Sequence, residues 1–514
     1  MITLSPAAVA GDFGLLNWTV LGGYLLAILL MGLYFSRREK STDDFFLAGR
    51  RIPWWAAGLS IIGTGLSALT FMGVPGKAYA GNWLHFTGNL VPILIVPIVI
   101  FFYLPFYRRL NVTTAYEYLE KRFNLAARLI GGLLYICFQF LRMAVILYLP
   151  ALALNTVAGL NIYACILAMG ILCTAYTILG GVEAVIWTDV LQVVVLMGAA
   201  IVCLAIIAGE VDGGFGAIIS KGMAEEKFKA ASFTWDPGAG ALWLFIVWRF
   251  FGDFMPNTAD QGIIQRYLTV PNLKSARRAA WVGGLSVIPV SLLFFSLGTA
   301  LWAFYQSRPE LLPKGLQNDQ ILPLFMVQQM PAGIAGLAIA GLFAAAMSSI
   351  DSSMNSVSAV VTTDAYRRFR PQADERSCLV LARWVTGITG LVGTAAALVI
   401  ASYAHQIQSM WEFFLYLLAW LGSPLAGMFV LGIFTRRANG LGACLGVAVG
   451  AGGILLAMKC VEPNIELKKW MWMLYPVIGL GGCVVTGYLA SLILPASKPR
   501  DLSGLTIHTV DKQN

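Results

Sequence analysis

The most unusual polar stretch of the chain runs from Ser348 to Ser353 and places four serines and an aspartate among six residues of an otherwise apolar segment. At about 100° per residue, a helix puts Ala345, Ser348, Ser349 and Ser352 within one arc of roughly 100°, and Asp351 lies about 60° further round. A single serine would mean little, because hydroxyls often bond back to their own helix carbonyls. Hydroxyls and a carboxylate on one face are hard oxygen ligands. The run therefore predicts a cation site.

A second interruption lies in the apolar stretch 53–79, where Gly63-Thr64-Gly65-Leu66-Ser67 stands near the middle. Two glycines around a threonine weaken a helix, and a broken helix leaves backbone carbonyls without partners. Transporters use such carbonyls to coordinate Na⁺. Close packing against a neighbouring helix explains the same glycines equally well.

Two charged residues interrupt other apolar segments. Asp189 either caps or pairs locally near a helix end, or supplies a charged oxygen ligand to a cation near the serines. Arg142 cannot lose its charge, so it meets either an acid within the membrane or a carboxylate of the substrate. Arg249 is a weaker candidate for a substrate contact, because Asp253 stands four residues later as a local partner.

The elements that carry these residues follow from the composition. Hydrophobic residues make up 58% of the 514 residues and charged residues only 12%, and the mean hydropathy is +0.75. This composition excludes a soluble enzyme, a nucleic-acid-binding protein and a disordered scaffold. We predict an all-α polytopic membrane protein with 13 transmembrane helices of about 20 residues or more. The predicted spans are 15–35, 53–79, 85–106, 126–158, 161–179, 183–208, 239–262, 280–305, 333–362, 380–403, 409–434, 440–458 and 471–494.

The distribution of Lys and Arg predicts the orientation. The stretches 36–52, 107–128, 266–278, 366–383, 435–440 and 495–514 carry 24 of the 35 basic residues. Basic loops remain in the cytoplasm, so the N-terminus is predicted outside and the C-terminus inside. No Lys or Arg precedes Arg37, which argues against a cleavable signal peptide. With three histidines, and with most cysteines in apolar runs, we expect neither a multi-histidine metal centre nor a disulfide framework.

Several longer motifs resemble those of the sodium:solute symporter family. They are Phe45–Arg51, Gly180–Asp189, Ala259–Tyr267 and Ala344–Asp364, and the resemblance extends over about 15–494. It implies a transporter rather than an enzyme, with a leucine-transporter-like core of two inverted five-helix repeats. The implied regions are a leading helix and loop (1–52), a first repeat (53–208), a second repeat (209–434), two trailing helices (435–494) and a cytoplasmic tail (495–514).

The resemblance also implies two sodium sites. Sodium site one would use the backbone carbonyls of Gly63, Leu66 and Ala345 with the hydroxyls of Ser348 and Ser349. Sodium site two, found in part of the family, would use Asp189, Ser348, Asp351 and Ser352. Asp351 stands where well-known members have a hydroxyl residue, so this chain departs from the family there.

Within the family, Phe138–Arg142 with Tyr148–Pro150, and Phe71–Tyr79, look most like the bacterial sialic acid transporters. That branch implies a pocket lined by Ser67, Thr70, Asn89, Arg142 and Phe250, with the arginine on the carboxylate of the sugar. The chain departs from the branch at three positions, Gly65, His85 and Asn89.

We therefore expect Na⁺-coupled symport of a small anionic solute, best described as a carboxylated sugar such as sialic acid. Its partners would be that solute, Na⁺ and the lipid bilayer, with no nucleic acid, and the protein would act as a monomer in a bacterial inner membrane. The main alternative is a symporter for a neutral sugar, a polyol or another metabolite, in which a protein acid holds Arg142. A channel and a transporter-like membrane sensor are more distant alternatives.

Overall fold

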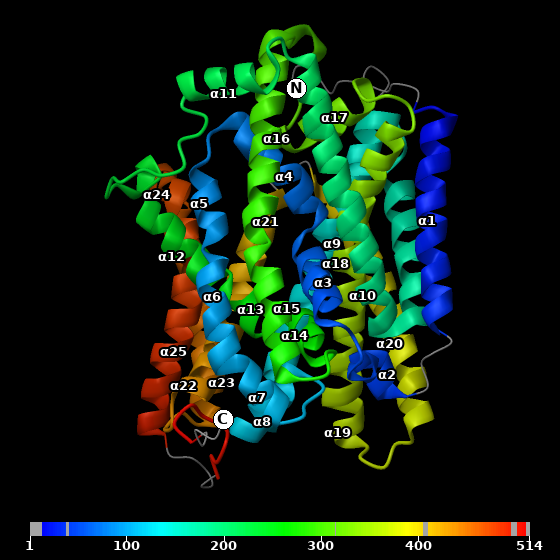
Figure 1. Cartoon of the computed structure of the whole chain (residues 1–514). Coiled ribbons are helices and arrows are strands. Elements are labelled where there is room, and N and C mark those ends of the chain that lie inside the picture. The colour runs from blue at the N-terminus through cyan, green and yellow to red at the C-terminus, as the bar shows by residue number, and fades with distance from the viewer. Residues whose placement is uncertain (1–12, 37–40, 314, 405–409, 495–500, 510–514) are drawn as a thin grey trace.

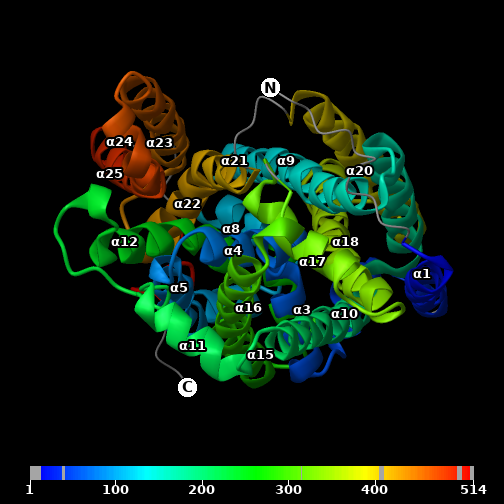
Figure 2. The same cartoon turned by 90° about the horizontal axis from the view of Figure 1, so that it is seen from above.

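The structure is a computed structural model that describes residues 13–36, 41–313, 315–404, 410–494 and 501–509. Across these ranges the regular elements are helices, and no residue lies in a β-strand. Figures 1 and 2 show the helices packed side by side in one bundle. The predicted all-α class is thus confirmed. Parts of the predicted leading region (1–12 and 37–40) and of the predicted tail (495–500 and 510–514) lie outside the described residues.

Most of the helices follow one another through short loops, and longer connections lie between Ala224 and Leu242 and between Ser307 and Ile321. The first are α1 (Leu15–Ser36), α2 (Thr42–Leu47), α3 (Trp54–Gly65), α4 (Ala68–Ala80), α5 (Leu84–Leu90), α6 (Pro92–Ile98), α7 (Leu104–Arg109), α8 (Ala115–Arg122), α9 (Leu125–Ala158), α10 (Ile162–Glu210), α11 (Gly214–Ala224) and α12 (Leu242–Gly252). The others are α13 (Phe254–Thr258), α14 (Gln261–Leu268), α15 (Leu273–Leu285), α16 (Val287–Ser307), α17 (Ile321–Gln328), α18 (Ile334–Val360), α19 (Arg367–Phe369), α20 (Glu375–Tyr403), α21 (Met410–Leu417), α22 (Ser423–Phe434), α23 (Gly440–Val461), α24 (Ile465–Trp470) and α25 (Tyr475–Ile493).

The number of membrane spans differs from the predicted thirteen. Within the described chain, ten helices are long and apolar enough to cross a membrane, or eleven when the bent pair α3–α4 is taken as one span. One reason is that α10, with 49 residues, covers two predicted spans. Another is that the predicted span 239–262 is divided among three short helices, of which the longest, α12, has 11 residues.

Helix α10 contains a sharp turn at Gly181. A straight helix of 49 residues would be about 74 Å long, more than twice the roughly 30 Å thickness of a hydrocarbon core. Gly181 instead takes φ 49° and ψ −160°, which side-chain sterics forbid to most other residues. Before this turn Tyr176 lies against Gly32 of α1, and after it Asp189 lies against Gly63 of α3. The turn therefore places Tyr176 beside α1 and Asp189 beside α3.

Helices α3 and α4 form the broken helix that the glycines predict. The two helices meet at an angle of 62°, and Leu66 and Ser67 between them have extended backbone. The prediction of a broken second span is therefore confirmed. The break lies beside α18, which carries the serines.

Helix α18 occupies the centre of the bundle. It is buried along nearly all of its length, and it packs against α3, α9, α10 and α20. Its first half is rich in alanine and glycine, and such small side chains allow helix backbones to approach closely. The polar half of α18 is therefore held deep in the bundle and away from lipid.

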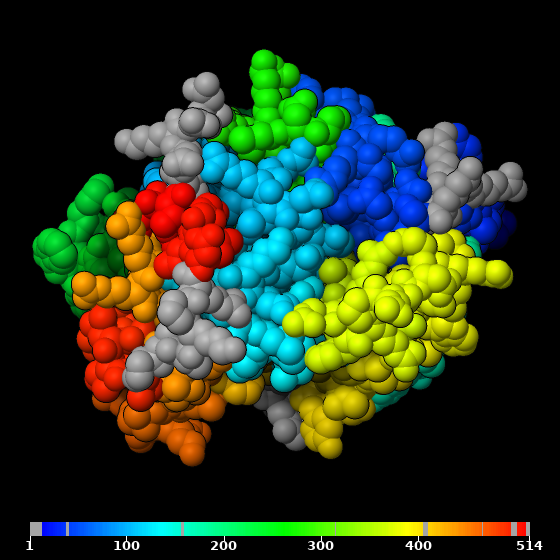
Figure 3. All heavy atoms as spheres, turned by 90° about the horizontal axis from the view of Figure 1, so that it is seen from below, coloured from blue at the N-terminus to red at the C-terminus, as the bar shows by residue number. Residues whose placement is uncertain are grey.

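Several of the basic loops gather at one end of the molecule. Thr42 of α2 donates a hydrogen bond to Glu375 at the start of α20, and Arg368 donates one to Glu120 of α8. The segment 501–509 packs on the same end, where the amide of Ile507 bonds to the Ile433 carbonyl. Figure 3 views this end from below. The loops from distant parts of the sequence thus form one face.

The turn at Gly181 generates a stability prediction. Gly181→Ala is expected to lower the melting temperature of the purified protein in detergent by several degrees, because an alanine at this φ and ψ costs about 1–3 kcal/mol. Gly198→Ala is the matched control, since it lies in the same helix and an added Cβ there meets no atom within 4 Å. Equal melting temperatures for the two variants would contradict the strain assigned to this turn.

Candidate functional site

The break between α3 and α4 presents backbone carbonyls to the serines of α18. The hydroxyl of Ser348 donates to the Gly63 carbonyl at 2.9 Å, and the hydroxyl of Ser349 donates to the Thr64 carbonyl at 3.3 Å. Ser348 also lies 3.3 Å from the Ala345 carbonyl. The structure thus brings three of the five residues predicted for sodium site one, Gly63, Ala345 and Ser348, into direct contact, and Ser349 bonds to Thr64 beside them. The fifth, Leu66, lies at the break itself.

The neighbouring serines of α18 complete a continuous polar stripe. Ser352 donates to the Ser348 carbonyl at 2.6 Å, and Ser353 donates to the Ser349 carbonyl at 2.8 Å. All four side chains are buried. Ser349 donates its hydroxyl proton to the broken helix, whereas Ser352 and Ser353 donate theirs to carbonyls of their own helix, and each hydroxyl oxygen keeps lone pairs for a further contact.

Asp189, predicted for sodium site two, is bound by an arginine that the sequence analysis placed in a basic loop. Arg266 of α14 donates to the Asp189 carboxylate at 2.8 Å and to the Ser352 hydroxyl at 2.6 Å. Ser60 donates to the same carboxylate oxygen at 2.5 Å. Arg266 is only 1% exposed, so counting it with the basic loop 266–278 was wrong. Its place inside the motif Ala259–Tyr267, which resembles the family, was the available signal.

Asp351, also predicted for sodium site two, bonds to a different partner from Asp189. One of its carboxylate oxygens accepts a hydrogen bond from Tyr176 of α10, on the side of α18 that faces α1. Ser348 and Ser352 face the broken helix instead. The structure therefore splits the four residues of sodium site two between two neighbouring polar networks.

Arg142 of α9 contacts both the broken helix and an acid. Its guanidinium donates to the Thr64 carbonyl at 2.8 Å and lies 3.5 Å from the carboxylate of Asp260. One interpretation of Arg142 was that it pairs with an acid of the protein, and Asp260 is the acid that lies next to it. The same guanidinium lines the central cavity, as the other interpretation requires.

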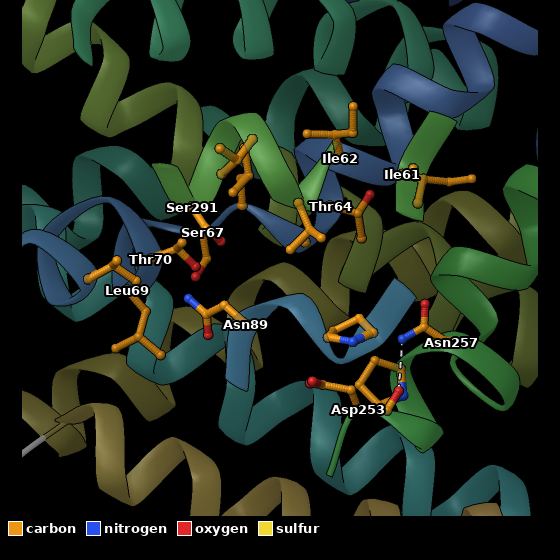
Figure 4. A pocket seen from close by; sticks show the side chains of 18 of the residues that line it. Ile61, Ile62, Thr64, Ser67, Leu69, Thr70, Asn89, Asp253, Asn257 and Ser291 are labelled. Atoms are coloured by element: carbon orange, nitrogen blue, oxygen red, sulfur yellow. Dashed lines mark hydrogen bonds between the residues drawn. The ribbon is translucent and has the colours of Figure 1, made fainter. Parts of the chain in front are cut away.

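The central cavity has a volume of about 310 Å³ and is enclosed by the broken helix and helices from both halves of the chain. Four of the five residues implied for the substrate pocket line it, namely Ser67, Thr70, Asn89 and Arg142. In Figure 4, Ser67, Thr70 and Asn89 lie close together, and Asp253 and Asn257 lie apart from them. The cavity is large enough to hold a small organic molecule.

Phe250, the fifth residue predicted for the substrate pocket, does not line this cavity. Its ring packs edge-on against Phe251 and at a tilt against Phe254. Its neighbour Arg249 lines the cavity instead, and Trp248 packs against Trp411.

Further charged residues line the cavity and one of its ends. Arg249 pairs with Asp253 at 2.9 Å, as the sequence spacing indicated. Lys77 lies 5.1 Å from the ring centre of Trp411 and 3.7 Å from the Glu412 carboxylate. Burial raises the pKa of Asp319 nearby, against the opposing effect of Lys77. Three basic side chains therefore face a cavity that is otherwise largely apolar.

Comparisons with known proteins agree with this architecture. The sequence pattern of the sodium:solute symporter family matches residues 45–450. A sodium/sialic acid symporter of Aliivibrio fischeri is 41% identical over 94% of this chain and 94% of its own length. A sodium/sialic acid symporter of Proteus mirabilis is 39% identical over 95% of this chain and 97% of its own length.

A solved structure is also similar. It shows a Na⁺-coupled sialic acid symporter in a substrate-bound outward-open state, with a TM-score of 0.87, 37% identity, and coverage of 95% of this chain and 100% of that one. The family pattern and the two relatives cover nearly the whole chain, including the broken helix and the serine helix. The chain belongs to the sodium:solute symporter family.

Proposed function

We propose that this protein couples the inward flow of Na⁺ to the uptake of a carboxylated sugar of the sialic acid type. The observation that carries the proposal is the contact of the Gly63 and Thr64 carbonyls with Ser348 and Ser349, beside a cavity that contains Arg142. The two bacterial relatives, named sodium/sialic acid symporters, support the choice of substrate. Transport proceeds by alternating access, in which the bound core opens first to one side and then to the other.

Sodium site one combines the carbonyls of Gly63, Leu66 and Ala345 with the hydroxyls of Ser348 and Ser349. Na⁺ is a hard cation, and five neutral oxygens suit it better than they suit a soft metal. When the ion binds, each hydroxyl turns its oxygen from the carbonyl toward the ion. The ion then joins α18 to the broken helix and holds the two elements together.

Sodium site two uses Asp189 with Ser348, Asp351 and Ser352. Arg266 and Ser60 hold one oxygen of the Asp189 carboxylate, while the other oxygen has no hydrogen-bond partner among the described residues. That second oxygen is the one available to an ion. Arg266 fixes the carboxylate in place and offsets part of its charge.

The substrate is held by Arg142, Ser67, Thr70 and Asn89. A guanidinium contacts a carboxylate through two parallel hydrogen bonds, which is stronger than a contact between neutral groups. The 3.5 Å separation of Arg142 from Asp260 is longer than such a charge-assisted bond. The substrate carboxylate can therefore compete for the guanidinium, while the hydroxyls and the amide bind sugar oxygens.

The energetics favour two ions per substrate. Each Na⁺ gains about 2.3 kcal/mol per 100 mV and about 1.4 kcal/mol per tenfold gradient, so two ions supply roughly 7.4 kcal/mol. Moving one anion inward against the voltage costs about 2.3 kcal/mol. The remaining energy of about 5 kcal/mol sustains a several-thousandfold accumulation, whereas one ion would leave only about 1.4 kcal/mol.

The architecture that we propose has thirteen spans, with two inverted five-helix repeats at 53–208 and 209–434. The count rises from eleven to thirteen when α10 is divided into two spans at Gly181 and the short helices α12 to α14 together form one more span. The face that carries the loops of α2, α8 and α20 is cytoplasmic, because it collects basic residues. The N-terminus is then outside, and the protein acts as a monomer in a bacterial inner membrane.

A symporter for a neutral sugar or polyol is the second candidate, and the proximity of Arg142 to Asp260 favours it. In that case the ion pair would persist throughout transport. Competition of labelled sialic acid uptake by neutral and carboxylated sugars in proteoliposomes separates the two. Strong competition by carboxylated sugars alone supports the first proposal.

The first prediction concerns sodium site one. Ser349→Ala is expected to raise the Na⁺ concentration for half-maximal uptake by about tenfold, since one lost ligand costs on the order of 1 kcal/mol. Ser358→Ala is the matched control, because Ser358 lies in the same helix and bonds to the Ala382 carbonyl away from the break. A Na⁺ dependence that is equal in both variants would remove Ser349 from the site.

The next prediction concerns Arg142. Arg142→Gln is expected to reduce uptake of carboxylated sugars by at least a hundredfold, because a two-pronged contact to a carboxylate is lost. The reduction should be specific to acids, so binding of Na⁺ alone, measured on the purified variant, should remain. Undiminished uptake of a carboxylated sugar by this variant would exclude Arg142 from the substrate contact.

A further inference from the structure

A second group of buried polar atoms lies where α1, α10 and α18 pack together, and it extends to Asp189 beside the broken helix. Four side chains there have polar atoms without hydrogen-bond partners among the described residues, namely the Tyr24 hydroxyl, both amide atoms of Gln192, one oxygen of Asp351 and one oxygen of Asp189. Gln192 is 1% exposed and both aspartates are fully buried. Buried polar atoms are paired in most proteins, so such a group points to a missing ligand.

The unpartnered groups lie near one another. Tyr24 of α1 is directed toward the Gln192 amide without forming a hydrogen bond to it, and it lies within electrostatic reach of Asp351 and Asp189. Tyr176 holds the other oxygen of Asp351, which fixes the carboxylate in this direction. The group therefore contains oxygen atoms from three helices.

The charges of this group do not balance. Asp189 and Asp351 lie within reach of each other, and Arg266 is the one basic residue among the described groups that act on Asp351. Arg266 donates its hydrogen bonds to Asp189, Ser352, Ser60 and the Gly262 carbonyl, and none of these bonds goes to Asp351. When both carboxylates are ionised, they and one guanidinium carry a net charge of −1, which is costly in a buried place unless a cation or a proton balances it.

We propose that this group binds a monovalent cation, Na⁺, through the Asp351 carboxylate, the Gln192 side-chain oxygen and the Tyr24 hydroxyl, with the free oxygen of Asp189 facing it. This proposal rests on the proposed sodium coupling and changes the position and ligands of the second ion. All the ligands are hard oxygens, which suits Na⁺ rather than a soft metal. One excess negative charge is balanced by one monovalent ion, whereas a divalent ion would leave an excess of positive charge.

The serines are poorly placed to hold this ion. The Ser352 hydroxyl donates to the Ser348 carbonyl, accepts from Arg266 and contacts Thr64 at 3.1 Å. Its lone pairs are thus occupied on the side of the broken helix. The ion therefore sits on the α1 side of Asp351, and α1, which precedes the two proposed repeats, supplies a ligand to it.

The test measures the Na⁺ dependence and the Na⁺-to-substrate ratio of the full-length protein in proteoliposomes, the ratio from the reversal potential. Tyr24→Phe removes one hydroxyl and is expected to raise the half-maximal Na⁺ concentration about tenfold. Tyr34→Phe is the control, since Tyr34 lies in the same helix and is 57% exposed. Asp351→Asn is expected to lower the ratio by one Na⁺ per substrate.

Gln192→Met preserves the length of the side chain and removes its polar atoms, so it keeps the test decisive if Asp351→Asn does not fold. The proposal is overturned if Tyr24→Phe and Gln192→Met both leave the Na⁺ dependence and the ratio unchanged while the original protein is Na⁺-dependent. It is also overturned if the original protein carries a proton that Asp351→Asn abolishes, because Asp351 would then hold a proton. Uptake by the original protein that does not depend on Na⁺ at all would instead refute the proposed function.

Discussion

The structure depends on how backbone carbonyls are satisfied where α3 stops and α4 begins. A helix end inside a bilayer has no water to take up its free carbonyls, and each unsatisfied group is costly. Here the Gly63 and Thr64 carbonyls receive hydrogen bonds from Ser348, Ser349 and Arg142. The broken helix is therefore tolerable only because α18 and α9 bring polar groups to it. Burial of α18 at the centre of the bundle follows from the same requirement.

Much of this arrangement could be predicted from the sequence because its signals are local. Four serines and an aspartate in an apolar segment are conspicuous, and two glycines around Thr64 weaken a helix wherever they occur. Both signals concern residues that are close in the sequence. The contact between the two segments, in contrast, followed from the resemblance to the family.

Other features could not be predicted because they depend on contacts between distant parts of the chain. Arg266 looks like the first residue of a basic loop, and only the packing of α14 under Asp189 makes it a buried ion-pair partner. The direction of Asp351 depends on Tyr176, which lies in another helix. The position of Phe250 depends on the rotation of α12, and a helix that is apolar on all sides gives little indication of its rotation.

The contacts of the Thr64 carbonyl link the two proposed binding events. A carbonyl oxygen has two lone pairs, and here Arg142 and Ser349 each occupy one of them. Any anion that draws the guanidinium away frees one lone pair of a carbonyl at the break and releases the tie between α9 and α3. Occupancy of the cavity is thereby transmitted to the unwound backbone through one shared oxygen atom, without any movement of a whole helix.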